Sequence, residues 1–227
     1  MKKYFFGAMM LLAVLAFTGC GNNNQKTNDQ KKPEMTAQHL LIIVDPQIDF
    51  TTGSLAVAKG PEAMDLLSAK LSEGLYKKFT KIVVTQDFHP ANHLSFVEQG
   101  GDFPPHCVQN TEGANVYPKL QEALNNIKDV NIEYLTKGDK ADKEEFSIFQ
   151  NEKNGNYLNE HIKLTEYNSI TICGIASDYC VLETLKDLLV FYPAEKVSVA
   201  MNCVASVADD EVLPAYMQEH GVKAITF

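Results

Sequence analysis

Short apolar runs alternate with longer amphipathic segments from residue 39 to the end of the chain. An apolar run of roughly four to eight residues is typical of a buried strand. The first such run, residues 39–44, is almost wholly aliphatic. The other runs of this kind are 81–85, 131–136, 169–173, 196–201 and 222–227. The pattern therefore predicts six buried strands.

Segments with helical spacing separate these runs. Pro61 opens the first of them, and its apolar positions are Met64, Leu67, Leu71, Leu75 and Phe79. Helices are also expected at 118–126, 157–164, 178–191 and 210–219. Buried strands that alternate with helices predict an α/β fold, a doubly wound (Rossmann-like) six-stranded parallel sheet with helices on both faces. No internal repeat is visible.

Polar, titratable residues follow several of the predicted strands. Asp45 follows the first strand, Asp87 and His89 the second, and Lys137 the third. The turn 174–180 follows the fourth. Ligands bind beyond the carboxyl ends of the strands in a sheet of this kind. We therefore expect the functional site at this edge.

The N-terminal segment has the composition of an export signal. Two lysines precede a nearly continuous apolar stretch, 5–17, which is followed by Cys20. Residues 1–19 resemble a bacterial lipoprotein signal, which implies lipidation of Cys20 and an exported, membrane-anchored protein, periplasmic or at the cell surface. The apolar stretch is shorter than the roughly 20 residues of a spanning helix. Residues 20–38 are polar and predict a disordered tether, which leaves 39–227 as the folded domain.

Composition restricts the partners. The net charge is −9, and all 20 basic residues are lysines. An acidic chain does not neutralise a phosphate backbone, so we expect no nucleic-acid partner. Without arginine the protein lacks the bidentate fork that usually holds carboxylates, which favours a neutral substrate. Monomer and homo-oligomer both stay open.

Four cysteines remain apart from Cys20, namely Cys107, Cys173, Cys180 and Cys203. An even number in an exported protein is compatible with disulfides. A domain of this size does not need them, and Cys173 and Cys203 lie in or beside apolar runs where a thiol packs. We expect free thiols.

Three residues are candidates for a site of nucleophilic chemistry. Cys180 lies where a strand turns into a helix, and the helix start favours its thiolate. Asp45 lies at the mouth of a buried strand, where partial desolvation raises a carboxylate pKa toward that of a general base. Each residue also fits a structural role, since such a cysteine commonly packs, such an aspartate caps a turn, and Lys137 fits a solvated loop.

The segments 45–50 (DPQIDF), 137–138 (KG) and 174–181 (GIASDYCV) resemble the signature segments of the isochorismatase-like cysteine hydrolases, in the same order. The resemblance runs from about residue 39 to the C-terminus. It implies that Cys180 is the nucleophile, Asp45 the general base and acid, and Lys137 their electrostatic support. It further implies an oxyanion hole from the backbone N–H groups of Ala176 and Cys180, and a cis peptide between Ile175 and Ala176.

A possible metal site lies between residues 87 and 106. Asp87 and three of the six histidines fall in this connection, and Asp87 and His89 can share an ion because one residue separates them. A polar loop with incidental histidines is the alternative. The segments 89–96 and 103–108 resemble those of nicotinamidases. That likeness implies one divalent ion (zinc, iron or manganese) on Asp87, His89 and His106, with His93 a further ligand in some members.

The same likeness places Phe50, Phe103, Phe146 and Tyr179 around the substrate. Phe103 stands where tryptophan is usual, Phe146 where tyrosine is usual, and 202–206 departs from a common DACRG pattern. The leading hypothesis is a nicotinamidase that hydrolyses nicotinamide to nicotinate and ammonia through a cysteine thioester. Alternatives are a related hydrolase acting on another small amide or a vinyl ether, and a non-catalytic lipoprotein that binds a pyridine-like ligand.

Overall fold

The computed structural model describes residues 37–227, which contain one sheet of six parallel strands. The strand order is β3-β2-β1-β4-β5-β6. The strands are β1 (His39–Val44), β2 (Lys81–Asp87), β3 (Asn131–Lys137), β4 (Ser169–Ile175), β5 (Val197–Ala205) and β6 (Lys223–Ile225). The predicted doubly wound α/β fold is confirmed.

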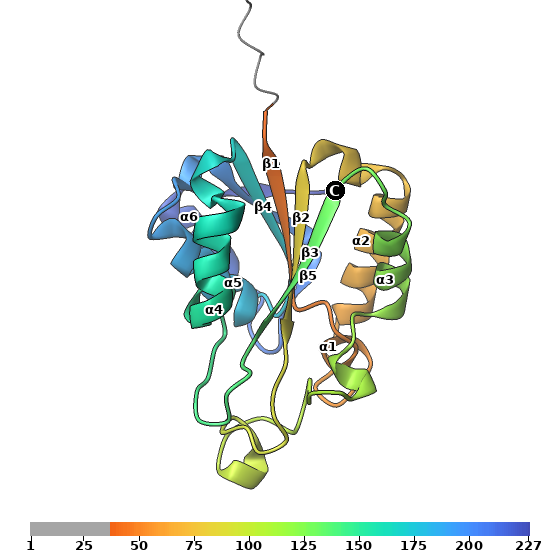
Figure 1. The fold of residues 1–227 in the computed structure, drawn as a ribbon, viewed down its shortest axis with the longest axis vertical. Helices are drawn as coiled ribbons and strands as arrows, with labels where there is room; N and C mark the ends of the chain where they lie inside the picture. The colour runs from red at the N-terminus through yellow and green to blue at the C-terminus, as the bar shows by residue number, and fades with distance from the viewer. Residues whose placement is uncertain (1–36) are drawn as a thin grey trace, which may run out of the picture. The chain divides into compact units, whose positions relative to one another are not determined.

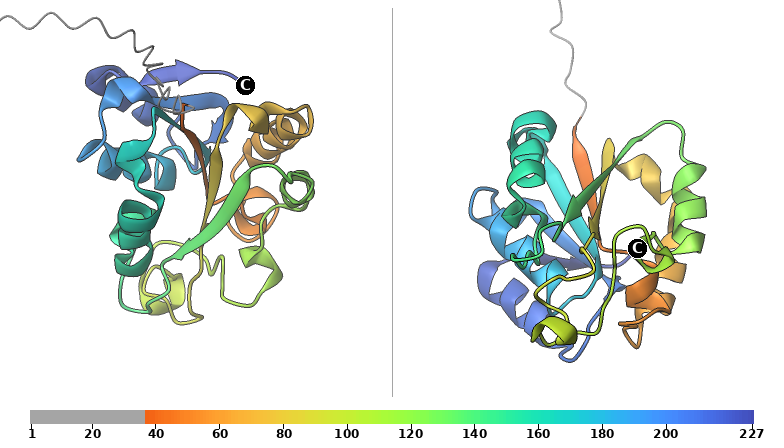
Figure 2. Two further views of the ribbon diagram at one scale, coloured as in Figure 1. Left: turned by 45° about the horizontal axis from the view of Figure 1, so that its top comes forward. Right: turned by 60° about the horizontal axis from the view of Figure 1, so that its bottom comes forward.

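Helices cover both faces of the sheet (Figures 1 and 2). Helices α2 (Gly60–Ser72) and α3 (Pro118–Asn125) lie on one face. On the other face lie α4 (Glu152–Tyr157), α5 (Cys180–Leu189) and α6 (Val212–His220). A one-turn helix, α1 (Ile48–Thr51), follows β1 and was not predicted.

Alternation along the strands divides the apolar residues into two cores. Leu41 and Ile43 of β1 pack in the core beneath α2 and α3, whereas Leu40 and Ile42 pack in the core beneath α5 and α6. All four side chains are fully buried. Each such burial contributes about 1.5–3 kcal/mol, so the central strand holds the two helical layers together.

The strand order reverses at the β1–β4 pair. The chain builds outward from β1 through β2 to β3, then returns to β4 and builds outward through β5 to β6. A crevice forms at such a point beyond the carboxyl ends of the two strands. The carboxyl ends of β1 and β4 lead to Asp45 and to the turn before Cys180.

Several predicted bounds were wrong. The helix expected through Phe79 ends at Ser72, because Gly74 adopts a positive φ of 102° and a 3₁₀ turn over Leu75–Lys78 follows. The helix expected at 157–164 begins at Glu152 and continues as a π turn over Leu158–Ile162.

The last four predicted elements also differ at their ends. Helix α5 begins two residues later than expected, at Cys180, and ends at Leu189, and α6 covers 212–220. β5 extends to Ala205 past an irregularity in its pairing with β4. β6 is shorter than predicted.

The predicted signal (1–19), most of the predicted tether (20–38) and the lipidation residue Cys20 lie outside the described residues. Within 37–227, no helix is long and apolar enough to cross a membrane.

Gly174 is required where β4 passes β1. Its φ is 123°, and a Cβ there would lie 2.0 Å from the main-chain oxygen of Val44. Backbone atoms at that distance cannot move aside without separating two central strands.

We expect Gly174→Ala to lower the free energy of unfolding by more than about 3 kcal/mol, because a steric clash adds to a strained φ. Gly221→Ala is the matched control, since its φ is 72° but nothing lies within 4 Å of the added Cβ. That control should cost only about 1 kcal/mol. Denaturant unfolding of the two variants measures the difference, and equal losses would contradict the role given to the β1–β4 contact.

Candidate active site

The predicted site residues meet at the carboxyl ends of the central strands. Asp45 follows β1, Asp87 ends β2, Lys137 ends β3, and Cys180 is the first residue of α5. Asp87 and Lys137 are direct partners in the parallel β2–β3 register. The connections at this edge gather at the bottom of Figure 1. The sheet thus brings together residues up to 135 positions apart in the sequence, from 45 to 180.

A single buried ammonium group links these residues. Lys137 Nζ lies 2.9 Å from Asp45 Oδ2 and forms a short ion pair with Asp87 Oδ1. It also lies 3.5 Å from Cys180 Sγ and donates to the main-chain oxygen of Glu145 at 3.1 Å. Lys137 is fully buried, so the solvated loop position is excluded.

Asp45 is held from both its side chain and its backbone. Its Oδ1 accepts from Thr85 Oγ1 at 2.7 Å, and its main-chain N–H donates to Thr85 O at 3.1 Å. Its φ is 43°, a left-handed value that aspartate tolerates better than most residues. This conformation turns the chain out of β1 and leaves the carboxylate fully buried beside Lys137.

Burial governs the protonation of the three residues. Burial raises the pKa of Asp45 above its usual value, against the opposing charge of Lys137. Although burial alone would lower the pKa of Lys137, the Asp45 and Asp87 carboxylates raise it well above its usual range. The ammonium therefore stays charged between two carboxylates.

Burial also raises the pKa of the Cys180 thiol well above its usual range; Lys137 opposes this shift, and Asp45 and Asp87 add to it. We expected the helix start to favour the thiolate, whereas burial, the largest influence on this pKa, acts in the opposite direction. A neutral thiol at this position needs a base before it can attack. Asp45 is the candidate, since Asp45, Asp87 and Cys180 offer side-chain atoms within 4.8 Å of one another.

The turn before Cys180 presents two backbone donors. The peptide between Ile175 and Ala176 is cis, as predicted. Ser177 N–H donates to Ala205 O at 2.7 Å, and Val181 N–H to Ala176 O at 2.9 Å. In the described part of the chain, no hydrogen bond engages the N–H groups of Ala176 and Cys180. They remain available to an anionic oxygen.

Asp45, Lys137 and Cys180 form the candidate catalytic triad. Beside this triad, Asp87, His89 and His106 fit a metal ion. One ligand atom from each lies within 4.8 Å of those of the other two, and all three residues are buried. His89 Nδ1 is bonded to Gly138 O at 2.9 Å and His106 Nδ1 to Pro104 O at 2.8 Å. A carbonyl fixes the proton on Nδ1, so both Nε2 atoms keep a lone pair for a metal. This donor set suits zinc and similar divalent ions.

Asp87 belongs to both groups. Burial alone would raise its pKa, but the charge of Lys137 and the contacts with His89 hold that pKa well below its usual range. A carboxylate that stays ionised suits a cation ligand.

The structure places His93 beside this set. Its ring stacks on His89 with centroids 4.0 Å apart. Its Nδ1 is bonded to Ser95 Oγ at 2.7 Å and its Nε2 to Lys143 O at 3.0 Å, so neither nitrogen is free in this rotamer. His93 instead groups with His89 and Glu144. Its role as a fourth ligand remains a prediction.

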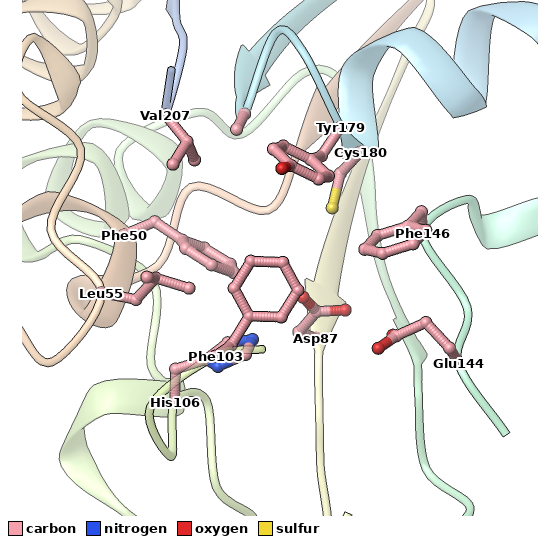
Figure 3. A pocket seen from close by; sticks show the side chains of 11 residues that line it. Phe50, Leu55, Asp87, Phe103, His106, Glu144, Phe146, Tyr179, Cys180 and Val207 are labelled. Carbon is pink, nitrogen blue, oxygen red and sulfur yellow. The ribbon is translucent and has the colours of Figure 1, made fainter. Parts of the chain in front are cut away.

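A small pocket opens onto Cys180, Asp87 and His106. In Figure 3 the Cys180 sulfur points into the cavity between Tyr179 and Phe146, toward Asp87. The walls include all four predicted aromatic residues, namely Phe50, Phe103, Phe146 and Tyr179. Phe103 and Tyr179 meet edge to face at 5.8 Å. A flat aromatic ring suits such a cavity.

Sequence reasoning missed several residues of the site. Gln47 is fully buried and bonds both main-chain groups of Asp87 at 2.7 Å. Asp49 accepts from the N–H of Cys107 at 2.7 Å and so fixes the loop that carries His106. Leu55, Glu144 and Val207 add to the pocket wall. For Gln47 and Asp49, the one signal in the sequence was a polar residue within segment 45–50, which resembles a family signature.

The four cysteines of the described domain are free thiols, as expected.

The domain model for the isochorismatase domain matches residues 39–226. The chain belongs to the isochorismatase family. Its curated relatives include the nicotinamidase of Escherichia coli, which is 31% identical over 168 residues, 66% of this chain and 75% of the relative. The nicotinamidase/pyrazinamidase of Mycobacterium tuberculosis is 34% identical over 152 residues, 65% of this chain and 76% of the relative.

Solved structures of the family agree with this fold. A pyrazinamidase of Pyrococcus horikoshii in complex with zinc is 32% identical with a TM-score of 0.69, covering 84% of this chain and 99% of that one. The protein PnC1 from L. infantum in complex with nicotinate is 30% identical with a TM-score of 0.70, covering 84% and 93%.

The geometry places His106, but not His93, with Asp87 and His89 in the candidate metal-binding set. We expect His106→Ala to lower zinc affinity by more than the about 10–100-fold that is typical of residues that only orient a ligand. His93→Ala, the control, should keep one zinc ion per chain. Isothermal titration of the metal-free proteins checks both. An equal loss in the two variants would contradict the placement of His93.

Proposed function

We propose that this protein is a metal-dependent nicotinamidase that hydrolyses nicotinamide to nicotinate and ammonia. It is a hydrolase that acts on a linear amide C–N bond. The observation that carries the proposal is one pocket lined by Cys180, Asp87 and His106. Lys137 links Cys180 and Asp87 to Asp45, and His89 groups with Asp87 and His106. Relatives named nicotinamidase support the substrate.

Asp45 and Cys180 perform the first half of the reaction. Asp45 accepts the thiol proton as Cys180 Sγ attacks the amide carbon, and a C–S bond forms. Because the Cys180 thiol has a raised pKa, proton removal and attack are coupled through Asp45. Lys137 stays charged throughout and balances the negative charge that passes between the two residues.

The backbone N–H groups of Ala176 and Cys180 then stabilise the oxyanion of the tetrahedral intermediate. Asp45 returns its proton to the leaving nitrogen, the C–N bond breaks, and ammonia departs. A thioester remains on Cys180. Asp45 next takes a proton from water, whose oxygen attacks the thioester. Asp45 passes that proton to the departing sulfur as the C–S bond breaks, and the released acid loses its own proton to solvent as nicotinate.

Asp87, His89 and His106 hold one divalent metal ion in this proposal, with zinc, iron and manganese as candidates. When bound, the ion supplies a Lewis-acid contact that orients the pyridine nitrogen. The aromatic walls at Phe103, Phe146 and Tyr179 hold the ring while the carboxamide faces Cys180. A pocket without a free cationic side chain among its lining residues selects a neutral amide.

We expect the reduced, metal-loaded domain to release ammonia from nicotinamide, and Cys180→Ala to release none, because the thioester cannot form. A coupled ammonia assay measures both. A reduced, metal-loaded wild-type protein that is inactive would refute the proposal.

The same assay separates the two enzyme hypotheses. A chelator should abolish ammonia release, and added metal should restore it. Activity on other small amides that survives metal removal would favour the second candidate, a related hydrolase of the family. Tight nicotinamide binding without turnover would favour the non-catalytic ligand-binding protein.

We also propose that the enzyme acts outside the cytoplasm, tethered through a lipid on Cys20. The lipoprotein-like segment 1–20 supports this location. In a bacterial host fed radiolabelled palmitate, the full chain should take up label and partition with membranes. Cys20→Ala should abolish the label, whereas Cys107→Ala should not. Label that persists in Cys20→Ala would contradict the tether.

A further inference from the structure

Glu145 is buried although it belongs to a strongly charged segment, 139–145. Its side chain is almost fully buried, whereas its neighbours Asp139 and Lys140 are solvent-accessible. A buried carboxylate is unfavourable unless hydrogen bonds and charges compensate it. Its contacts therefore indicate what it does.

The side-chain hydrogen bonds and the ion pair of Glu145 all go to residues within 138–151, in the connection that follows β3. Oε2 accepts from Gly138 N–H at 2.8 Å and from Asn151 Nδ2 at 2.8 Å. Oε1 pairs with Lys143 Nζ at 2.7 Å. Of these partners, Gly138 lies directly after Lys137 in the chain.

Through Gly138, Glu145 reaches the metal-binding set. The N–H of Gly138 is held by Glu145, and its carbonyl accepts from His89 Nδ1 at 2.9 Å. Gly138 has a φ of 65°, and a Cβ there would lie 2.4 Å from His89 Cε1. The imidazole therefore rests directly against this residue, and the carbonyl that orients His89 moves if Gly138 moves.

Through its own backbone, Glu145 reaches the triad. Its main-chain oxygen accepts from Lys137 Nζ at 3.1 Å. The other contacts of the Lys137 ammonium group are with Asp45, Asp87 and Cys180. Glu145 therefore contacts both parts of the site. Its main-chain oxygen accepts from Lys137, and its side chain holds the Gly138 peptide that orients His89.

We propose that Glu145 is a positioning residue that holds Lys137 of the triad and His89 of the metal-binding set in one fixed arrangement. This inference rests on the proposed function. Glu145 acts by the reach of its acceptor oxygen to Gly138 N–H, and its negative charge serves to balance Lys143.

Two conservative variants separate reach from charge. Glu145→Asp keeps the charge but withdraws the oxygen from Gly138, whereas Glu145→Gln keeps an oxygen at the same reach and loses the charge. Glu145→Gln is combined with Lys143→Met, so that no ammonium faces the new amide. Lys143→Met alone is the control, because it removes the ion pair and leaves the acceptor.

Cobalt serves as the metal probe, followed by its visible absorption in the purified full-length protein. We expect Glu145→Asp to weaken cobalt binding about 10–100-fold, as for other residues that orient a metal-binding histidine. The Lys143→Met control and the Lys143→Met/Glu145→Gln double variant should bind within about threefold of the wild type, well below that range. Wild-type affinity in Glu145→Asp, or a tenfold loss in the double variant alone, overturns the proposal.

The rate at which iodoacetamide alkylates Cys180 reports on the other end of the arrangement. It should fall about tenfold in Glu145→Asp, because the main-chain oxygen that accepts from Lys137 shifts once the side chain no longer anchors residue 145 to Gly138. An unchanged rate would overturn the link to the triad. If Glu145→Asp fails to fold, the double variant still decides, since reach alone must then preserve cobalt affinity and alkylation.

Neither measurement requires nicotinamide turnover. An enzyme that prefers another substrate would leave both results unchanged and would change only the ammonia assay. Failure of this inference and failure of the proposed function are therefore distinguishable.

Discussion

The site depends on one buried ammonium group placed between two carboxylates. Lys137 contacts Asp45 on one side and Asp87 on the other, at the ends of three adjacent strands. Removing one partner of such a buried pair typically costs about 3–5 kcal/mol, because the remaining charge is left without compensation. The parallel register that sets Lys137 opposite Asp87 therefore fixes the surroundings of Cys180 and the proposed metal-binding residues together.

This coupling explains why the two halves of the chemistry lie so close. Asp45 belongs to the proposed catalytic triad and Asp87 to the proposed metal-binding set, yet they share a single counter-charge. Gln47 strengthens the link, since its amide bonds both main-chain groups of Asp87. The substrate pocket forms where these groups end and aromatic side chains begin.

The alternation of apolar runs was enough to predict six strands, and the position of Asp45, Lys137 and Cys180 at strand ends was enough to predict their meeting. Strand order was beyond a single sequence, because nothing local distinguishes a central strand such as β1 from its neighbours. Glu145 was missed because burial of a charged residue depends on loops that pack around it, as with its contact to Gly138. The rise in the Cys180 pKa was missed for a related reason, since a local helix effect was considered without the surrounding burial.

The buried state of Cys180 has a consequence for chemical survival. Peroxides and small disulfides react with a thiolate, not with a protonated thiol. Burial and the nearby Asp45 and Asp87 carboxylates raise the pKa of this thiol against the opposing charge of Lys137, and only 5% of the residue is exposed. Cys173 and Cys203 are likewise fully buried with raised pKa values. Burial and a raised pKa therefore slow the reaction of these thiols with oxidants, and in the proposed mechanism Cys180 gains reactivity when Asp45 takes its proton.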